Sequence, residues 1–269
     1  PSRQRPADYY LKPIEHGWCF GNNVLGPNGA ELLHDSLMDL EHIYWRGLPP
    51  VIVSGIAPQG ATYKALKKYF SKDFTFLRFS SDVQCGASLR GGVDGFYSRR
   101  SANHRKKIRQ QLRRAHDAGV TFERHCPTSK SEADGIFKRM LKVELASWKG
   151  IEDCGMTEPV SKAFYDALLK RLVVSEDARI IFAMHEGHDI GFIFGSMAAK
   201  IYRGQQFSFD ESWSHASIGN VLQAEQIKRL CEEGAVRYDM GPRFGPGMEY
   251  KKHWVERLYH IQTWFLVKR

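Results

Sequence analysis

Apolar spacing divides the first 94 residues into two helices and two strands. A helical stripe predicts a helix over 30–45, formed by Leu32, Leu33, Leu37, Leu40 and Ile43. A β-branched run predicts a short strand at Val51–Val53, and helical spacing predicts a helix at Ala61–Phe70. The aromatic run Phe74–Phe79 predicts a largely buried strand. This part of the chain is therefore α/β material.

The second part predicts helices and then an antiparallel meander. Helices are expected over 98–118, 131–148, 162–173 and 218–233, and strands over 120–123, 179–184, 189–198, 201–209, 236–240 and 258–267. In the helix over 131–148 we expect Ile136, Met140, Val143 and Leu145 to point inward. Tight connections join the strands at 179–184, 189–198 and 201–209. The overall pattern predicts an α/β protein.

Composition narrows the class of protein. The 269 residues are 42% hydrophobic and 26% charged, which excludes collagen-like, coiled-coil and wholly disordered chains. No run approaches the length of a membrane span. Five widely spaced cysteines predict reduced thiols and a cytoplasmic protein, and the pair His16 and Cys19 is expected to be a loop rather than half a metal site. The polar start lacks an initiator Met, so we expect a chain trimmed at its front.

A basic stretch stands out within a formal net charge of +9. Eight cations occur between residues 99 and 114 with no acid before Asp117: Arg99, Arg100, Arg105, Lys106, Lys107, Arg109, Arg113 and Arg114. Like charges one turn apart repel, and a nearby anion would relieve the repulsion. We therefore expect Arg105, Lys106, Arg109 and Arg113 to bind a polyanion, for which tRNA, CoA phosphates and an acidic peptide all qualify. A merely solvated helix face is the alternative.

A candidate anion site precedes the predicted helix over 218–233. Helix N-termini present free backbone N–H groups and a positive dipole. We expect Ser217 to cap this helix, Gly219 to let a ligand approach the backbone, and Asn220 to lie beside it. An ordinary capped helix is the alternative.

An ordered set of motifs extends over about residues 95–269. It comprises Glu144 followed by Ser147-Trp148-Lys149-Gly150, then Phe209-Asp210, Ser217-Ile218-Gly219, Tyr238-Asp239, and Tyr250-Lys251-Lys252-His253-Trp254. This order resembles the GNAT-fold acyltransferases of the CelD-like group, which are related to Fem-type aminoacyl transferases. Ile218 replaces the usual Pro, and the strict GNAT phosphate motif is not present in "HASIGN".

The resemblance implies a fold and a reaction. It implies a GNAT-like, largely antiparallel sheet flanked by helices in a domain over 95–269, preceded over 1–94 by a smaller α/β segment that resembles a diverged half GNAT domain. It implies transfer of an acyl group from an acyl thioester, with acyl-CoA or an acyl carrier protein as donor, to an amine. The donor is expected along Phe207, Ser208 and Phe209 and at Ser217, Gly219 and Asn220.

Within this reading, the attacking amine must lose a proton. Asp210 is the first candidate for the base, Asp239 the second and Glu144 the third, and Lys251 is expected to position the substrate. Further candidate substrate contacts are Trp148, Lys149, Tyr202, Gln206, Arg243 and Tyr250.

Two other functions stay open. One is Fem-type transfer from aminoacyl-tRNA, and the other is a non-catalytic module that binds a polyanion. No metal is expected, because "HEGH" at His185–His188 fits a hairpin turn rather than a zinc motif.

Overall fold

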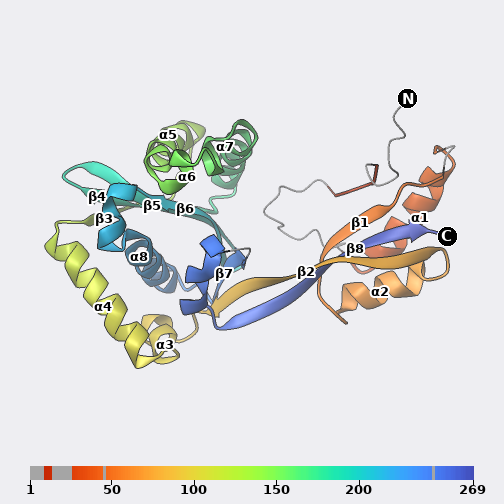
Figure 1. Ribbon diagram of the computed structural model, residues 1–269, viewed down its shortest axis with the longest axis horizontal. Helices are drawn as coiled ribbons and strands as arrows, with labels where there is room; N and C mark the ends of the chain where they lie inside the picture. Colours follow the sequence, from red (N-terminus) through yellow and green to blue (C-terminus); the bar gives the residue numbers. More distant parts are fainter. Residues whose placement is uncertain (1–8, 14–25, 45–46, 244–245) are drawn as a thin grey trace. The chain divides into compact units, whose positions relative to one another are not determined.

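The computed structural model describes residues 9–13, 26–44, 47–243 and 246–269 (Figure 1). These residues form two units, which are treated separately below. Unit 1 comprises Pro1–Cys85, Gly241–Lys252 and Arg257–Arg269, and unit 2 comprises Gly86–Met240 and His253–Glu256. The division into 1–94 and 95–269 inferred from the sequence differs from these units and stays a prediction. His16 and Cys19 lie outside the described residues.

Unit 1 is a small α/β layer built around one apolar cluster. Its elements are α1 (Gly29–Glu41), β1 (Val51–Ile56), α2 (Ala61–Phe70), β2 (Phe74–Ser88, of which residues 74–85 belong here), η4 (Pro246–His253) and β8 (Arg257–Lys268). The strand order is β1-β8-β2, with Val51 antiparallel to Leu266. Leu66 and Phe70 of α2 pack with Phe74 and Leu266 in the core. These contacts bury the apolar stripe predicted for α2. The stripe predicted over 30–45 is wrong in part, because Leu37 is buried in α1 whereas Leu32 is 65% exposed and Ile43 lies beyond the end of the helix.

Unit 2 is a sheet with helices on both faces (Figure 1). Its elements are α3 (Gly92–Ser98), α4 (Ala102–Asp117), β3 (Thr121–His125), α5 (Lys130–Ala146), α6 (Trp148–Ile151), η2 (Gly155–Thr157), α7 (Pro159–Val174), β4 (Ala178–His185), β5 (His188–Ala198), β6 (Ile201–Phe209), η3 (Glu211–Ala216), α8 (Ile218–Glu232) and β7 (Arg237–Pro242, of which residues 237–240 belong here). The order is β7-β6-β5-β4-β3. Strands β3 to β6 are antiparallel, whereas β6 and β7 are parallel.

The two helical layers of unit 2 cover opposite faces of the sheet. Helices α5, α6 and α7 lie on one face, and α4 and α8 lie on the other (Figure 1). On the α4 and α8 face, Ala115, Val221 and Leu222 pack against Ile193 and Phe207. Side chains alternate between the faces of a strand, so Gln206 and Ser208 point to the α5–α7 face. The mixed α/β, largely antiparallel fold class is confirmed.

Several local predictions are confirmed and others are wrong. The bounds of the helix at Ala61–Phe70 and of the strand at Ile201–Phe209 are confirmed. Strand β2 extends to Ser88, and Phe79, expected to be buried, is 66% exposed because alternate residues of β2 face outward. Leu145, expected to point inward, is 61% exposed, since the buried stripe of α5 runs through Met140, Val143 and Glu144.

Candidate functional site

The pairing of β6 with β7 covers three positions. Residues 201–203 pair with residues 237–239, whereas β6 continues to Phe209. At the far end of β6, the Asp210 N–H donates to the Ile190 carbonyl at 2.9 Å, which sets the direction of the backbone groups. Hydrogen-bonding direction alternates along a strand, so Ser208 bonds toward β5, and Phe207 and Phe209 direct their N–H and C=O groups to the opposite edge. This edge of β6, residues 204–209, is called the β6 edge below.

Eight residues separate the end of the β6 edge from the start of helix α8. Ser217 occupies its N-cap position with a positive φ of 58°, and its side chain makes no capping hydrogen bond, contrary to the prediction. Its carbonyl accepts from the N–H groups of Asn220 and Val221 at 3.0 and 3.2 Å. Among the described residues, the N–H groups of Ile218 and Gly219 have no backbone acceptor. These two donors are therefore the ones that a ligand at the helix start could use.

Gly219 leaves room for aromatic rings. A Cβ atom at this position would lie 3.1 Å from Cε1 of Phe209 and 3.3 Å from Cε2 of Phe207. The space that the missing side chain leaves is therefore filled by the two rings of β6, which pack against α8. This packing supplies a structural reason for the glycine, independent of any ligand.

Lys149 connects helix α6 to the β6 edge. Its Nζ donates to Gln206 Oε1 at 2.8 Å, to the Phe207 carbonyl at 2.9 Å and to Ser208 Oγ at 3.0 Å. The Lys149 side chain is only 14% exposed. Burial lowers the pKa of this ammonium, and the nearby Glu144 carboxylate opposes that shift. The structure thus places Lys149 and Gln206, both predicted as substrate contacts, together with Ser208.

Glu144 is a fully buried carboxylate at the end of α5. Its Oε1 accepts the Met156 N–H at 3.0 Å and lies 3.9 Å from Nζ of Lys149. Its Oε2 has no partner among the described residues. The chain leaves the helix at Ser147, whose φ and ψ are −83° and 165°, and this extended residue turns Lys149 back toward Glu144. These contacts make Glu144 the counter-charge of Lys149.

The other two predicted bases each have a structural partner. Asp210 is the N-cap residue of η3, and its Oδ1 accepts from the Ser212 N–H at 2.9 Å and from Ser212 Oγ at 2.6 Å. Asp239 accepts from Arg203 Nη1 at 2.7 Å. Asp210 directly follows the β6 edge, whereas Asp239 lies where β6 and β7 are still paired.

The remaining predicted substrate contacts are distributed over both units. Trp148 is 43% exposed on α6, whereas Tyr202 is fully buried and stacks edge-on against Tyr238. Burial raises the pKa of the Tyr202 hydroxyl far above its ordinary value. Arg243, Tyr250 and Lys251 belong to unit 1. There, Lys251 is buried and donates to the Pro242 carbonyl.

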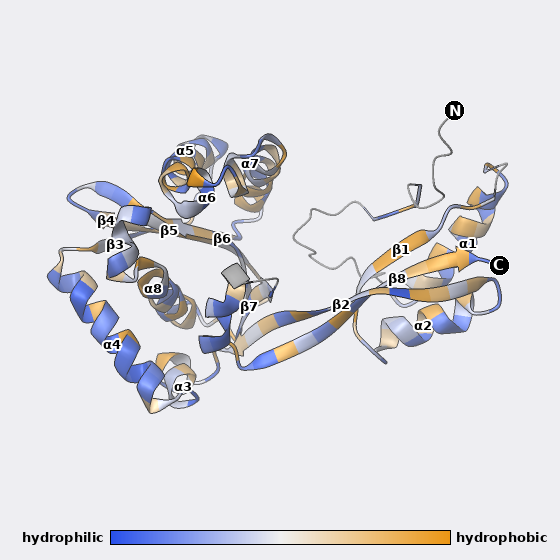
Figure 2. Cartoon of the chain, in the orientation of Figure 1, coloured by the Kyte–Doolittle hydropathy of each residue, from blue (hydrophilic) through white to orange (hydrophobic). Residues whose placement is uncertain are grey.

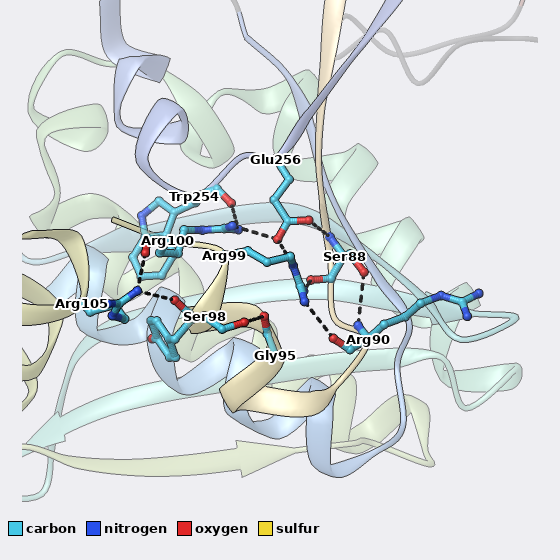
Figure 3. Close-up of polar contacts among 10 residues, drawn as sticks. Ser88, Arg90, Gly95, Ser98, Arg99, Arg100, Arg105, Trp254 and Glu256 are labelled. Atoms are coloured by element: carbon cyan, nitrogen blue, oxygen red, sulfur yellow. Dashed lines mark hydrogen bonds and ion pairs between the residues drawn. The ribbon is translucent and has the colours of Figure 1, made fainter. Parts of the chain in front are cut away.

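Part of the basic stretch is engaged in a partly buried network (Figure 3). Glu256 accepts from Arg99 Nε at 2.9 Å and from Arg100 Nη1 at 2.8 Å, and its second oxygen accepts the Ser88 N–H at 3.0 Å. Arg105 donates to the Arg100 carbonyl at 2.6 Å. Burial raises the pKa of the Glu256 carboxyl, but these hydrogen bonds outweigh it and hold the pKa below its usual value. Three of the eight cations therefore hold the start of α4 in place.

The other five cations lie on the exposed face of α4. They are Lys106, Lys107, Arg109, Arg113 and Arg114. This face of the helix is strongly hydrophilic (Figure 2). Its buried side carries Ile108, Gln111 and Ala115. No ion pair of these five cations is present among the described residues. We call this set the α4 basic face.

Sequence reasoning missed Glu256 and Ser208 as polar anchors. Glu256 lies 156 positions after Arg100, so no local pattern could pair them. The sequence indicates Ser208 only as a contact for the acyl donor, because the alternation of side chains along a strand does not show that Lys149 reaches it.

The described part of the chain contains no group of three or more His, Cys, Asp or Glu side chains arranged to hold a metal ion. Nor does it contain a helix with the length and apolar content of a membrane span. Cys85, Cys126, Cys154 and Cys231 are free thiols.

Comparison with known proteins identifies the family. The sequence profile described as "Acetyltransferase (GNAT) domain" matches residues 102–252, which is more than half of the chain. The protein therefore belongs to the GNAT acetyltransferase domain family. It is an acyltransferase, a class whose reaction requires an acyl donor and an amine acceptor, so the non-catalytic alternative is set aside.

Solved structures support the same fold at low sequence identity. FemX matches with a TM-score of 0.61 at 12% identity, covering 94% of this chain and 79% of FemX. L-PGS from Bacillus licheniformis matches with a TM-score of 0.61 at 14% identity, covering 89% and 73% of the two chains. The C-terminal domain of a putative lysylphosphatidylglycerol synthetase from Agrobacterium fabrum gives a TM-score of 0.59 at 14% identity, with coverage of 87% and 73%. A search of curated proteins gave no significant match.

Proposed function

We propose that the protein transfers an acyl group from an acyl thioester, carried by CoA or by an acyl carrier protein, to an amine of a small molecule or peptide. The observation that carries this proposal is the β6 edge, where pairing with β7 has ended and helix α8 follows. A pantetheine arm contains amides that can pair with such an edge as an added strand. Its phosphates would then reach the start of α8 at Ser217, Gly219 and Asn220.

The proposed chemistry uses groups along the β6 edge. The acceptor nitrogen attacks the thioester carbonyl carbon, the C–N bond forms, and the C–S bond breaks to release a thiolate that takes up a proton. The N–H groups of Phe207 and Phe209 are proposed to polarise the carbonyl. Asp210, at the end of this edge, is proposed to take the proton from the amine, with Asp239 as the next candidate. Trp148, Tyr202, Arg243, Tyr250 and Lys251 stay proposed substrate contacts.

The experiment measures CoA binding by calorimetry on Asn220→Glu, with Asn220→Gln as the neutral control of matched size. A carboxylate in the first turn of α8 favours the helix dipole but repels a phosphate. We therefore expect the Kd for CoA to rise at least ~10-fold in Asn220→Glu without a lower Tm, and to change less than ~2-fold in Asn220→Gln. An unchanged Kd in Asn220→Glu, or no CoA binding by the wild type, would contradict the placement of the donor.

A second candidate donor, aminoacyl-tRNA, is favoured by the α4 basic face. A phosphate backbone held by these cations would bind less tightly as salt increases, because binding releases condensed counterions. The binding of bulk tRNA is measured by fluorescence anisotropy between about 50 and 200 mM salt, the range over which such contacts lose affinity steeply.

The variant for this test reverses Lys106, Arg109 and Arg113 to Glu. Arg105 is left intact because its guanidinium already bonds the Arg100 carbonyl. The matched control reverses Lys138, Lys142 and Lys162, three exposed lysines on the opposite helical layer, so both variants have the same net charge. Loss of tRNA binding in the first variant alone supports the second candidate. Weak, salt-independent binding by the wild type would leave the α4 basic face as a solvated surface.

A further inference from the structure

The Lys149 cluster contains polar atoms that the described residues leave without partners. Nζ of Lys149 holds Oε1 of Gln206, but Nε2 of the same Gln206 side chain is buried and unpartnered. Gln206 as a residue is only 8% exposed. Oε2 of Glu144 is buried and unpartnered as well. Buried polar groups are almost always hydrogen-bonded, so a donor and an acceptor left over in one cluster indicate a missing polar partner.

The cluster lies where the proposed donor would react. Nζ of Lys149 is 2.9 Å from the Phe207 carbonyl oxygen. This carbonyl points toward the β6 edge, because hydrogen-bonding direction alternates along a strand. The N–H of Phe207 points to the same edge, since the N–H and C=O of one strand residue share a side. An acyl carbonyl polarised at this edge would therefore lie beside a fixed positive charge.

The local sequence is arranged to hold this charge. Ser147 Oγ donates to the Glu144 carbonyl at 2.7 Å, which closes the end of α5 and directs the chain into α6. A Cβ atom on Gly155 would lie 2.5 Å from Oε1 of Glu144, so a larger residue here would displace the carboxylate. A buried ammonium costs desolvation, and a carboxylate at 3.9 Å offsets part of that cost. A buried, fixed ammonium such as that of Lys149 can stabilise negative charge that develops on a reacting group beside it.

We propose that Lys149 is a catalytic residue whose ammonium, with its three N–H bonds donated to β6, stabilises by its charge the negative charge on the acyl carbonyl oxygen, and that Glu144 is the residue that positions it. As the acceptor nitrogen bonds to the carbonyl carbon, the π electrons move to the oxygen beside Nζ. They return when the C–S bond breaks and the thiolate leaves. Lys149 keeps its proton throughout, and the amine proton goes to the separate base. This inference rests on the proposed use of a thioester at the β6 edge.

The first experiment uses Lys149→Met with acetyl-CoA as donor and hydroxylamine as the probe acceptor. Hydroxylamine is unprotonated at neutral pH, so its own ionisation does not enter the alkaline limb of the rate profile. We expect Lys149→Met to lower kcat by about 10²- to 10³-fold, the range for losing one oxyanion-stabilising group. The Kd for CoA should change less than ~2-fold, because CoA lacks the acyl carbonyl.

The pH profile provides the second measurement, which a purely structural lysine would not affect. Burial lowers the pKa of Lys149, so wild-type kcat should fall on an alkaline limb that begins below the range of an ordinary lysine. Lys149→Arg keeps the charge at all these pH values, so its residual activity should lack that limb.

The outcomes separate this inference from the proposed function. A folded Lys149→Met protein with kcat within ~3-fold of the wild type would overturn the role of Lys149. An alkaline limb that is still present in Lys149→Arg would overturn it too. Neither result would contradict the proposed donor site. Failure of the wild type to bind CoA or to use acetyl-CoA instead overturns the proposed function, and this inference with it.

Discussion

Replacing Glu144 with Gln removes the counter-charge of Lys149 while keeping the shape of the side chain. Glu144 is fully buried and lies 3.9 Å from Nζ of Lys149. Two unit charges at this separation interact by about 4 kcal/mol at an effective dielectric constant of ~20. The Gln oxygen can still accept the Met156 N–H, so that hydrogen bond is not lost. Because Lys149 also keeps its three acceptors on β6, we expect Glu144→Gln to lower the free energy of unfolding by about 2–4 kcal/mol.

Urea unfolding followed by circular dichroism measures this loss, provided that the m-value is unchanged. Glu152→Gln is the matched control, since Glu152 is an exposed acid in the same segment, and its effect should stay within ~0.5 kcal/mol. The double variant with Lys149→Met should be less destabilised than the two single effects predict, because no unpaired charge remains. Strict additivity, or a Glu144→Gln protein as stable as wild type, would refute the argument that the pair is coupled.

Two further predictions concern unit 2. Glu256→Gln leaves the buried Arg100 without its charged partner, and we expect it to cost about 2–4 kcal/mol near neutral pH. Hydrogen bonds depress the pKa of Glu256, so its contribution to the stability of the wild type should be fully present above the ordinary pKa of 4.5 and vanish as pH falls through the lowered pKa. Measuring the free energy of unfolding of both proteins at decreasing pH checks this. A difference in stability between them that does not depend on pH would contradict it. Gly155→Ala should lower the Tm more than Gly234→Ala. Both glycines have a positive φ, 85° and 75°, but only a Cβ atom at Gly155 would meet a neighbour, Oε1 of Glu144. Equal decreases in Tm would show that backbone strain alone matters.

Sequence patterns predicted the elements that bury one apolar face. Helix α2 and strand β6 have the predicted bounds because hydrophobic spacing determines which side packs. Helix α3 was missed, since its seven residues bury only Phe96 and include two glycines. The second half of β2 was missed because its residues are polar or small and show no apolar alternation, although Cys85 and Ala87 are buried there. Backbone hydrogen bonds between strands do not require a periodic pattern of side chains, so spacing alone does not predict this part of the strand.

The candidate site was predicted as a set of residues but not as an arrangement. The motif from Glu144 to Gly150 indicated that Lys149 matters, yet a continuous helix would have pointed Glu144 and Lys149 in different directions. The extended backbone at Ser147 brings them together, and no spacing rule predicts it. In the same way, the charge run over residues 99–114 could not show which cations have a partner. Glu256 neutralises Arg99 and Arg100 from a distant strand end, whereas the α4 basic face has no such acid.

The discontinuity of unit 1 has a consequence for how the chain acquires its structure during synthesis. Val51 of β1 pairs with Leu266, 215 positions later, and the whole of residues 86–240 lies between them in unit 2. A ribosome therefore releases α1, β1 and α2 long before their central strand, β8, exists. Closing so long a loop is entropically costly unless the intervening segment folds first and shortens it. We expect unit 2 to become protected from proteolysis on the nascent chain, while β1 presents an unpaired edge that a chaperone can occupy until β8 arrives.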